Sequence, residues 1–165
     1  MIVSLIAVVD ARMAIGFGGD QLVYISEDLK RFKAITSGHT IVMGRKTSDA
    51  LPKGMLAKRR NIVMSQSPRQ WPDNMLVASS AEQVVSMCQK EDEIFIIGGG
   101  EIYRIFMPIA DRLYLTHIQH TFDQADTFFP EIDSAQWQAV REHELLTDEA
   151  SGLQFRYIDY QRIGK

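Results

Sequence analysis

The sequence predicts a single α/β domain with a largely parallel sheet. Three observations lead to this prediction. Short apolar runs rich in β-branched residues alternate with short amphipathic segments, which is typical of parallel strands joined by helices. Two of the apolar runs end abruptly in glycine and pass directly into a helical pattern. Near the C-terminus, two long segments flank a run of turn residues, so we expect them to pair as an antiparallel hairpin.

The elements can be placed along the chain from these patterns. Helix 26–36 is expected to be capped by Ser26, and Ser79 with Glu82 has the spacing of a capping box for a helix that runs to about Gln89. Residues 10–24, with three glycines, are predicted to form a loop that acts as a lid. Strands are expected at 2–9, 39–43, 61–64, 75–78, 93–97 and 112–118, hairpin arms at 136–146 and 153–163, and further short helices after Gly44 and at 101–107.

Composition limits the classes of function. The chain has 165 residues, of which 45% are hydrophobic and 24% charged, so we treat 1–165 as one globular domain. A net charge of −3 gives no reason to expect binding to nucleic acid or to a membrane surface. The single cysteine, Cys88, cannot form an intramolecular disulfide, which favours the cytoplasm, and we find no targeting or transmembrane pattern.

One carboxylate lies within the apolar stripe of helix 26–36. Phe32 and Ile35 follow Asp28 by four and seven residues, so the three side chains share a face, with Leu29 beside them. The simpler interpretation is that Asp28 is one of the acids common in a first helical turn. The alternative is a functional carboxylate whose pKa is raised by apolar surroundings. This segment alone favours the simpler interpretation.

Two glycine turns are candidates for binding a phosphate-bearing cofactor. They are 43–47, which contains Gly44, Arg45, Lys46 and Thr47, and 97–101, which contains Gly98, Gly99, Gly100 and Glu101. Glycine lets a phosphate approach backbone N–H groups at the carboxyl ends of parallel strands. Each turn alone is more often a tight structural turn, and neither matches the common dinucleotide or Walker patterns. Two such turns in one domain, with basic residues beside one of them, favour NADP over NAD.

Other candidate groups carry weaker signals. His117 and His120 are expected on opposite faces of a strand and its exit, so we predict no metal site there. The basic run 58–60 is either a solvated loop or a carboxylate-binding site, and its residues do not decide between the two.

Eight short motifs occur in order over essentially the whole chain. They are Ser4-Leu5-Ile6-Ala7, Ala14-Ile15-Gly16, Glu27-Asp28-Leu29 with Phe32-Lys33, Val42-Met43-Gly44-Arg45-Lys46-Thr47, Arg59-Arg60-Asn61-Ile62-Val63, Ile96-Ile97-Gly98-Gly99-Gly100-Glu101-Ile102-Tyr103, Tyr114-Leu115-Thr116-His117-Ile118, and Asp126-Thr127 with Phe129-Pro130. In this register they resemble the bacterial dihydrofolate reductase family. The resemblance implies a three-layer αβα sandwich around an eight-stranded mixed sheet. It also implies reduction of 7,8-dihydrofolate to tetrahydrofolate, with hydride from NADPH added to C6 of the pterin and a proton to N5.

The resemblance assigns expected roles to individual residues. Asp28, assisted through water by Thr116, would bind the pterin and favour protonation at N5. Substrate would contact Leu29 and Phe32, its α-carboxylate would bind Arg59, and Ile6, Val8, Ile97 and Tyr103 would line the pterin and nicotinamide pockets. Cofactor would be held by Ala7, Ile15, Gly16, Gly44, Arg45, Lys46, Thr47, Ser65, Gln66, Gly98, Gly99, Gly100, Glu101 and Ile102, with Arg45 and Ser65 favouring the 2′-phosphate. A cis peptide is expected at Gly98-Gly99, and the chain is expected to act as a monomer.

The departures from the family pattern lie in the lid. The chain lacks the tryptophan that family members usually carry there, and Tyr24 is the aromatic that could replace it. We therefore expect diaminopyrimidine antifolates such as trimethoprim to bind differently from their fit to typical bacterial members. Two alternatives remain at this point. One is another NADPH reductase of the same fold, such as the pyrimidine reductase of riboflavin synthesis; the other is a non-catalytic folate- or nucleotide-binding module.

Overall fold

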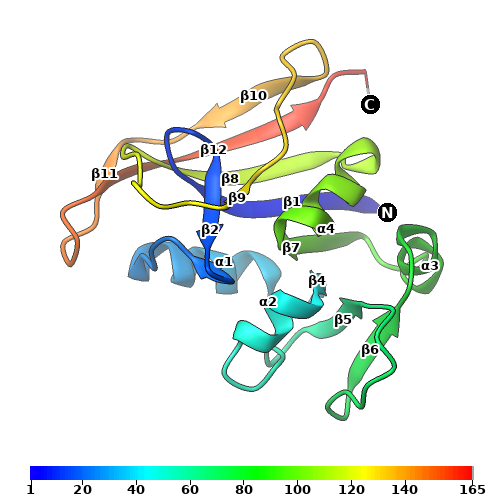
Figure 1. The fold of residues 1–165 in the computed structure, drawn as a ribbon. Coiled ribbons are helices and arrows are strands. Elements are labelled where there is room, and N and C mark those ends of the chain that lie inside the picture. The colour runs from blue at the N-terminus through cyan, green and yellow to red at the C-terminus, as the bar shows by residue number, and fades with distance from the viewer. Residues whose placement is uncertain (165) are drawn as a thin grey trace.

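The main sheet has the order β10-β12-β8-β1-β7-β4-β5-β6 in the computed structural model, which describes residues 1–164 (Figure 1). The pairs among β8, β1, β7, β4, β5 and β6 are parallel, and β12 pairs antiparallel with β8, β10 and the short strand β11. The strands are β1 (Ile2–Val9), β4 (Thr40–Gly44), β5 (Arg60–Met64), β6 (Met75–Ala78), β7 (Glu93–Gly98), β8 (Arg112–Ile118), β10 (Trp137–Glu142), β11 (Leu146–Thr147) and β12 (Gln154–Arg162). The predicted mixed, mostly parallel sheet with a C-terminal hairpin is confirmed, and β11 is an addition to it.

Successive side chains of the central strands point to opposite faces of the sheet, and each face carries an apolar layer. On β7, Ile94 and Ile96 belong to one cluster while Phe95, between them, belongs to the other. Helix α1 (Ser26–Thr36) packs with the Phe95 cluster through Phe32 and Ile35. Helices α3 (Ala81–Met87) and α4 (Gly100–Phe106) cover the opposite face, and α2 (Arg45–Ala50) follows β4 directly. The αβα sandwich expected from the resemblance is therefore present.

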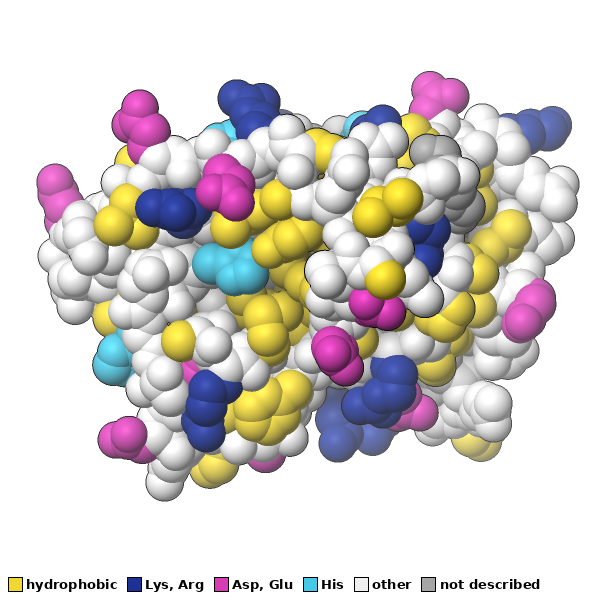
Figure 2. All heavy atoms as spheres, turned by 90° about the horizontal axis from the view of Figure 1, so that it is seen from above, with side chains coloured by type: hydrophobic (Ala, Val, Ile, Leu, Met, Phe, Trp, Pro, Cys, Tyr) yellow, Lys and Arg dark blue, Asp and Glu magenta, His cyan; other side chains and the backbone are white. Residues whose placement is uncertain are grey.

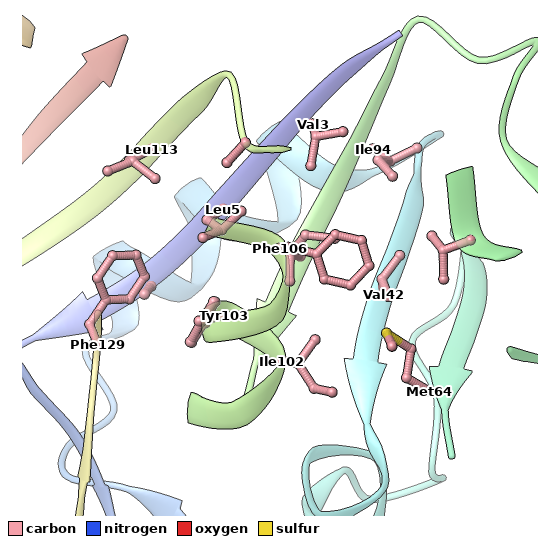
Figure 3. Packing of buried hydrophobic residues seen from close by; sticks show 14 of the residues in the cluster. Val3, Leu5, Val42, Met64, Ile94, Ile102, Tyr103, Phe106, Leu113 and Phe129 are labelled. Atoms are coloured by element: carbon pink, nitrogen blue, oxygen red, sulfur yellow. The ribbon is translucent and has the colours of Figure 1, made fainter. Parts of the chain in front are cut away.

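The core beneath α4 fixes the helix against the sheet. Phe106 and Leu5 are fully buried, and Figure 3 shows Phe106, Ile102 and Tyr103 of α4 directed toward strands β1, β7 and β4. A single 3-10 turn, Met107–Ile109, continues from α4. Because α4 begins at the glycine turn after β7, this packing also fixes the turn.

Both predicted helix caps are displaced by one residue. The N-cap of α1 is Ile25 rather than Ser26, and no side chain caps this end. Ile25 is buried, so packing sets where the helix begins and places Ser26 within its first turn. The N-cap of α3 is Ser80, whose Oγ accepts the Gln83 backbone N–H at 3.1 Å, so the predicted box of Ser79 with Glu82 is wrong. This helix ends at Met87, before the predicted end.

The predicted loop at 10–24 contains two short strands, which corrects the expectation of an unstructured segment. Strands β2 (Ala14–Phe17) and β3 (Asp20–Gln21) form a hairpin around Gly18 and Gly19, both with positive φ. Such a conformation is typical of a tight two-residue turn between strands. On its other side β2 pairs antiparallel with β9 (Thr127–Phe128), giving a separate small sheet. We call residues 14–24 the lid.

The surface carries charges of both signs. On the face in Figure 2, acidic and basic side chains are interspersed around hydrophobic ones, with no large area of one sign. This distribution agrees with the small net charge of −3. No helix within residues 1–164 is long and apolar enough to cross a membrane.

Candidate active site

A pocket of about 430 Å³ opens between the lid, α1, α2 and the carboxyl end of β7. Strands β1 and β8 form its floor through residues such as Ala7 and Thr116. Because the parallel strands end at this edge, side chains from distant parts of the sequence meet here. Most of the predicted site residues line the pocket, namely Ile6, Ala7, Val8, Ile15, Gly16, Asp28, Leu29, Phe32, Lys46, Thr47, Arg59, Ile97, Gly98, Gly99, Gly100, Tyr103 and Thr116.

Asp28 projects from the first turn of α1 into this pocket. Its Oδ1 accepts a hydrogen bond of 2.5 Å from the Thr116 hydroxyl of β8. The contact is direct, whereas the resemblance implied one through water. Burial among apolar groups raises the pKa of the Asp28 carboxyl, while the Thr116 hydrogen bond and the charge of Arg31 oppose this rise. A carboxyl held at a raised pKa inside a pocket is suited to proton-dependent chemistry.

Tyr103 closes the pocket beside Asp28. Its hydroxyl donates 2.7 Å to the Ile6 backbone carbonyl of β1, and its ring packs against Phe129. Burial and the nearby Asp28 charge both raise the pKa of the Tyr103 hydroxyl, so it stays a hydrogen-bond donor. The tyrosine therefore holds α4 to β1 at the base of the pocket.

Arg59 lies at the rim beside the aromatic ring of Phe32. Its guanidinium carbon is 5.9 Å from that ring, its Nε donates 2.8 Å to the Ala57 carbonyl, and its Nη1 donates 3.2 Å to Thr36 Oγ1. Partial burial lowers the pKa of Arg59, yet the group stays charged at neutral pH. The remaining guanidinium N–H groups are able to donate to a ligand carboxylate, which is compatible with the carboxylate-binding interpretation of the basic run.

The glycine turn after β7 forms a wall made of backbone. The Gly98–Gly99 peptide bond is cis, as the resemblance implied, and Gly98 has φ of +124°. A Cβ on Gly100 would lie 2.6 Å from Thr127 Cγ2 of β9, and one on Gly44 would lie 2.9 Å from Ile102 Cγ1. Glycine is therefore required for close packing at both turns, and the bare backbone beside Lys46 and Thr47 suits a phosphate-bearing group.

Six predicted cofactor residues lie outside the pocket lining, namely Gly44, Arg45, Ser65, Gln66, Glu101 and Ile102. Ile102 is buried in the core. Arg45 is exposed, with its Nη1 3.6 Å from Asp49 Oδ2, and Ser65 Oγ accepts the Ser67 backbone N–H at 3.0 Å. Gly44 and Met64 pair across β4 and β5, so Arg45 and Ser65 leave the sheet side by side at the same edge.

The lid supplies pocket residues beyond the predicted site residues, among them Tyr24, the aromatic that could replace the family's tryptophan. Tyr24 is half-exposed and its hydroxyl donates to Asp20 Oδ1 of β3. Burial and the Asp20 carboxylate raise the pKa of Tyr24 to about 12. The lining residues that were not among the predicted site residues are Phe17, Gly19, Asp20, Gln21, Tyr24, Arg31, Lys33, Ala50, Leu51, Leu56 and Thr127. The lid's glycines were the only local signal for several of them.

The two histidines considered for a metal site have separate aromatic partners. His117 Nε2 lies 3.0 Å from the Tyr160 hydroxyl, and the His120 ring packs edge-on against Phe122. Within residues 1–164, no group of three or more His, Cys, Asp or Glu side chains could hold a metal ion.

Comparisons with known proteins agree over nearly the full chain. The family profile described as dihydrofolate reductase matches residues 2–162. The chain is 37% identical to the dihydrofolate reductase of Bacillus subtilis strain 168 over 160 residues, covering 97% of this chain and 94% of that protein. It is 34% identical to dihydrofolate reductase type 3 of Salmonella typhimurium, covering 98% and 99%. A solved structure of dihydrofolate reductase from Enterococcus faecalis, complexed with NADP(H) and RAB-propyl, superposes with a TM-score of 0.89 at 32% identity, covering 98% of this chain and 96% of that one.

Proposed function

Because the chain belongs to the dihydrofolate reductase family, we propose that it reduces 7,8-dihydrofolate to tetrahydrofolate with NADPH, supporting one-carbon and thymidylate metabolism. The observation that supports this most directly is the position of Asp28. Its carboxyl, bound to Thr116, lies in the same pocket as the glycine turn at 98–100. A proton-dependent group and a cofactor wall are thus within reach of one ligand. This arrangement suits the reaction and not a simple binding module.

Asp28 is the residue that we assign to proton chemistry. Its carboxylate accepts hydrogen bonds from the pterin N3 and 2-amino groups, and its charge favours the protonated state at N5. Thr116 keeps the carboxyl in one orientation through its 2.5 Å hydrogen bond. Because burial raises the pKa of Asp28, the group takes up a proton more readily than an exposed aspartate would, which suits proton exchange with the substrate.

The substrate's two ends require different surroundings. The pterin lies against the apolar wall from β1 and α1, which includes Ile6, Val8 and Phe32, and Leu29 packs on the benzoyl group. The negatively charged glutamate tail reaches the rim, where Arg59 pairs with its α-carboxylate. Apolar burial of one end and ion pairing of the other together fix the direction in which the substrate enters.

NADPH, when bound, supplies the hydride. The residues assigned to it run from Ala7, Ile15 and Gly16 to the two glycine turns, with Ile97 and Tyr103 beside the nicotinamide. Lys46 and Thr47 of α2 lie at the same wall as Gly98–Gly100 and are suited to its phosphates. Arg45 and Ser65, adjacent at the sheet edge, favour the 2′-phosphate.

The experiment that tests this proposal is loss of NADPH absorbance on addition of dihydrofolate. We expect oxidation by the wild type and a loss of at least about a hundredfold in Asp28→Asn near neutral pH, since acid–base groups contribute on this scale. The Asn variant keeps the size of the side chain and an oxygen for Thr116. Cofactor binding without oxidation in the wild type would instead favour a binding module, and an undiminished rate in the variant would remove Asp28 from its role.

The assembly state and location belong to the same proposal. We propose a monomer in the cytoplasm, where the buried thiol of Cys88 stays reduced. A single species at the mass of one chain, 18.7 kDa, in light scattering would support the monomer. A stable species of twice that mass would contradict it.

A further inference from the structure

Arg31 is a pocket residue that the proposed reaction has not used. It lies on α1 three positions after Asp28, so the two side chains share one side of the helix. Its side chain is only 18% exposed. A guanidinium withdrawn from water beside a functional carboxyl requires an explanation, because burying an arginine is costly unless its charge is used.

Two residues of β12 hold the guanidinium in place. Its Nη2 donates 3.0 Å to Asp159 Oδ1, and its central carbon lies 4.1 Å from the centroid of the Tyr157 ring. The Asp159 side chain is 17% exposed, so this ion pair is weakly screened. A planar cation stacked on one side and hydrogen bonded on the other has little freedom to move.

Strands β8 and β12, which pair with each other, hold the two groups that act on Asp28, namely Thr116 and Arg31. Tyr157 of β12 is paired with Thr116 of β8, which donates to the Asp28 carboxyl. Two groups therefore act on Asp28. One is the Thr116 hydroxyl of β8, and the other is the Arg31 guanidinium, which belongs to the same helix as Asp28 and is held by β12. The positive charge of Arg31 lowers the pKa of Asp28, against the larger effect of burial.

Resting on the proposed function, we propose that Arg31 is a positioning residue whose positive charge favours the ionised form of Asp28. Asp159, which is hydrogen bonded to Arg31, weakens this effect. Arg31 stabilises the ionised carboxylate after it has given up a proton. Asp159 neutralises part of the arginine's charge, so the cation does not hold Asp28 permanently ionised. The pair would thereby adjust the pH range in which the enzyme works.

Other charged and titratable groups surround this arrangement. They are Glu27 on α1, Tyr103 on α4, Tyr114 on β8, Tyr157 on β12, and His143, whose Nε2 lies 3.5 Å from Asp159 Oδ2. Across the pocket, the lid contributes Asp20, which already accepts a hydrogen bond from Tyr24. Of the groups near Asp28, Arg31 is the cation that acts on its pKa.

The test compares pH profiles of single-turnover dihydrofolate reduction in four variants. Arg31→Met removes the charge but keeps an unbranched apolar stem. Arg31→Lys keeps the charge, and Asp159→Asn removes the opposing carboxylate. Lys30→Met is the matched control, because it removes one positive charge from an exposed position of the same helix that does not line the pocket.

We expect the midpoint of the profile to move to higher pH in Arg31→Met, because loss of a nearby cation raises the pKa of a carboxyl. Asp159→Asn should move it to lower pH, because the arginine is then unopposed and a negative charge is lost. Arg31→Lys should stay near the wild type, and Lys30→Met should not move, because its charge is screened by water. Opposite shifts from two partners of one ion pair are not expected from loss of packing alone.

A second measurement separates this inference from the proposed function. Titration of the Asp28 carboxyl by carbon NMR in the ligand-free protein reports its pKa without any turnover. A wild type that reduces dihydrofolate, with Arg31→Met unshifted relative to Lys30→Met by both methods, would overturn the role of Arg31 alone. A wild type without activity would overturn the function, while the NMR titration would still test Arg31. If Arg31→Met fails to fold, Asp159→Asn and Arg31→Lys decide: a shift of Asp159→Asn to higher pH contradicts the inference.

Discussion

Thr116 and Asp28 lie 88 positions apart in the chain, and the threonine hydroxyl donates a 2.5 Å hydrogen bond to the aspartate carboxyl. This contact joins β8 to α1 through the floor of the pocket. It also lowers the pKa of Asp28 against the effect of burial. The one hydroxyl thus attaches α1 to β8 and acts on the carboxyl that we propose for proton chemistry.

Replacing Thr116 by valine should raise the pKa of Asp28 further, because the ionised carboxyl loses its donor. We expect the midpoint of the pH–rate profile to move upward and the free energy of unfolding to fall by about 1 kcal/mol. Steady-state kinetics across pH, with chemical denaturation, measure both effects. Thr116→Ser keeps the hydroxyl and is the control; a valine variant with the wild-type profile would show that the bond has no role in proton chemistry.

Replacing Asp28 by asparagine should stabilise the fold while it removes activity. The folded pKa of Asp28 is raised, so the folded state binds more protons than the unfolded state between the two pKa values. Stability is consequently lost as pH rises through this window and stays low above it. We expect the free energy of unfolding of Asp28→Asn to exceed that of the wild type at pH 8 by on the order of 1 kcal/mol, and thermal unfolding across pH should show this difference shrinking in acid. A variant that is equally stable at all pH values would contradict the raised pKa.

Arg59 should affect only substrates that carry a glutamate tail. Losing a charge-assisted contact costs about 1.5–3 kcal/mol, so Arg59→Gln should raise the KM for dihydrofolate roughly tenfold to a hundredfold. The KM for NADPH should not change, and neither should turnover of a dihydropterin without the tail. The truncated substrate is the internal control: if its kinetics fall as much as those of dihydrofolate, Arg59 supports the fold and not the carboxylate.

The contact between Tyr24 and Asp20 lies within the lid and should hold it in one conformation beside the pocket. Tyr24→Phe removes the hydroxyl and keeps the ring, and we expect the KM for dihydrofolate to rise about twofold to tenfold through loss of one hydrogen bond. Because the pKa of Tyr24 is raised to about 12, the hydroxyl stays protonated throughout an ordinary assay range. The effect should therefore not vary with pH below about 10. A change in KM that tracks pH in this range would point to another group.

Local patterns were sufficient to place much of the fold. Strands β1, β6 and β8 have the predicted bounds. Strand β1 is a mostly buried apolar run, β6 is a short apolar run, and β8 alternates between buried and partly exposed residues. The lid strands were missed because β2 pairs with β9, where Gly16 lies opposite Thr127, and no local pattern shows so distant a partner. Helix caps were misplaced where burial of Ile25, and not side-chain capping, decided the start.

The residues of the candidate site show the same difference between local patterns and tertiary contacts. Asp28 could be singled out because its helix spacing to Phe32 is a local property. Its hydrogen bond to Thr116 required the resemblance to suggest a partnership at all, and the direct contact required the structure. Arg31 gave no signal, because its partners Asp159 and Tyr157 come from the C-terminal strand. Contacts that depend on tertiary pairing were the ones that the sequence alone could not supply.

Gly100 and Thr127 give the sharpest packing prediction. A Cβ on Gly100 would lie 2.6 Å from Thr127 Cγ2, so Gly100→Ala should force β9 away from α4 and cost about 1–3 kcal/mol of stability. Because β9 pairs with β2 of the lid, we also expect weaker NADPH binding, measured by fluorescence titration. Thr127→Ser removes the clashing methyl group, so the double variant should recover most of both losses. Equal defects in the single alanine variant and the double variant would show that the backbone of the glycine turn, and not the contact with β9, requires glycine.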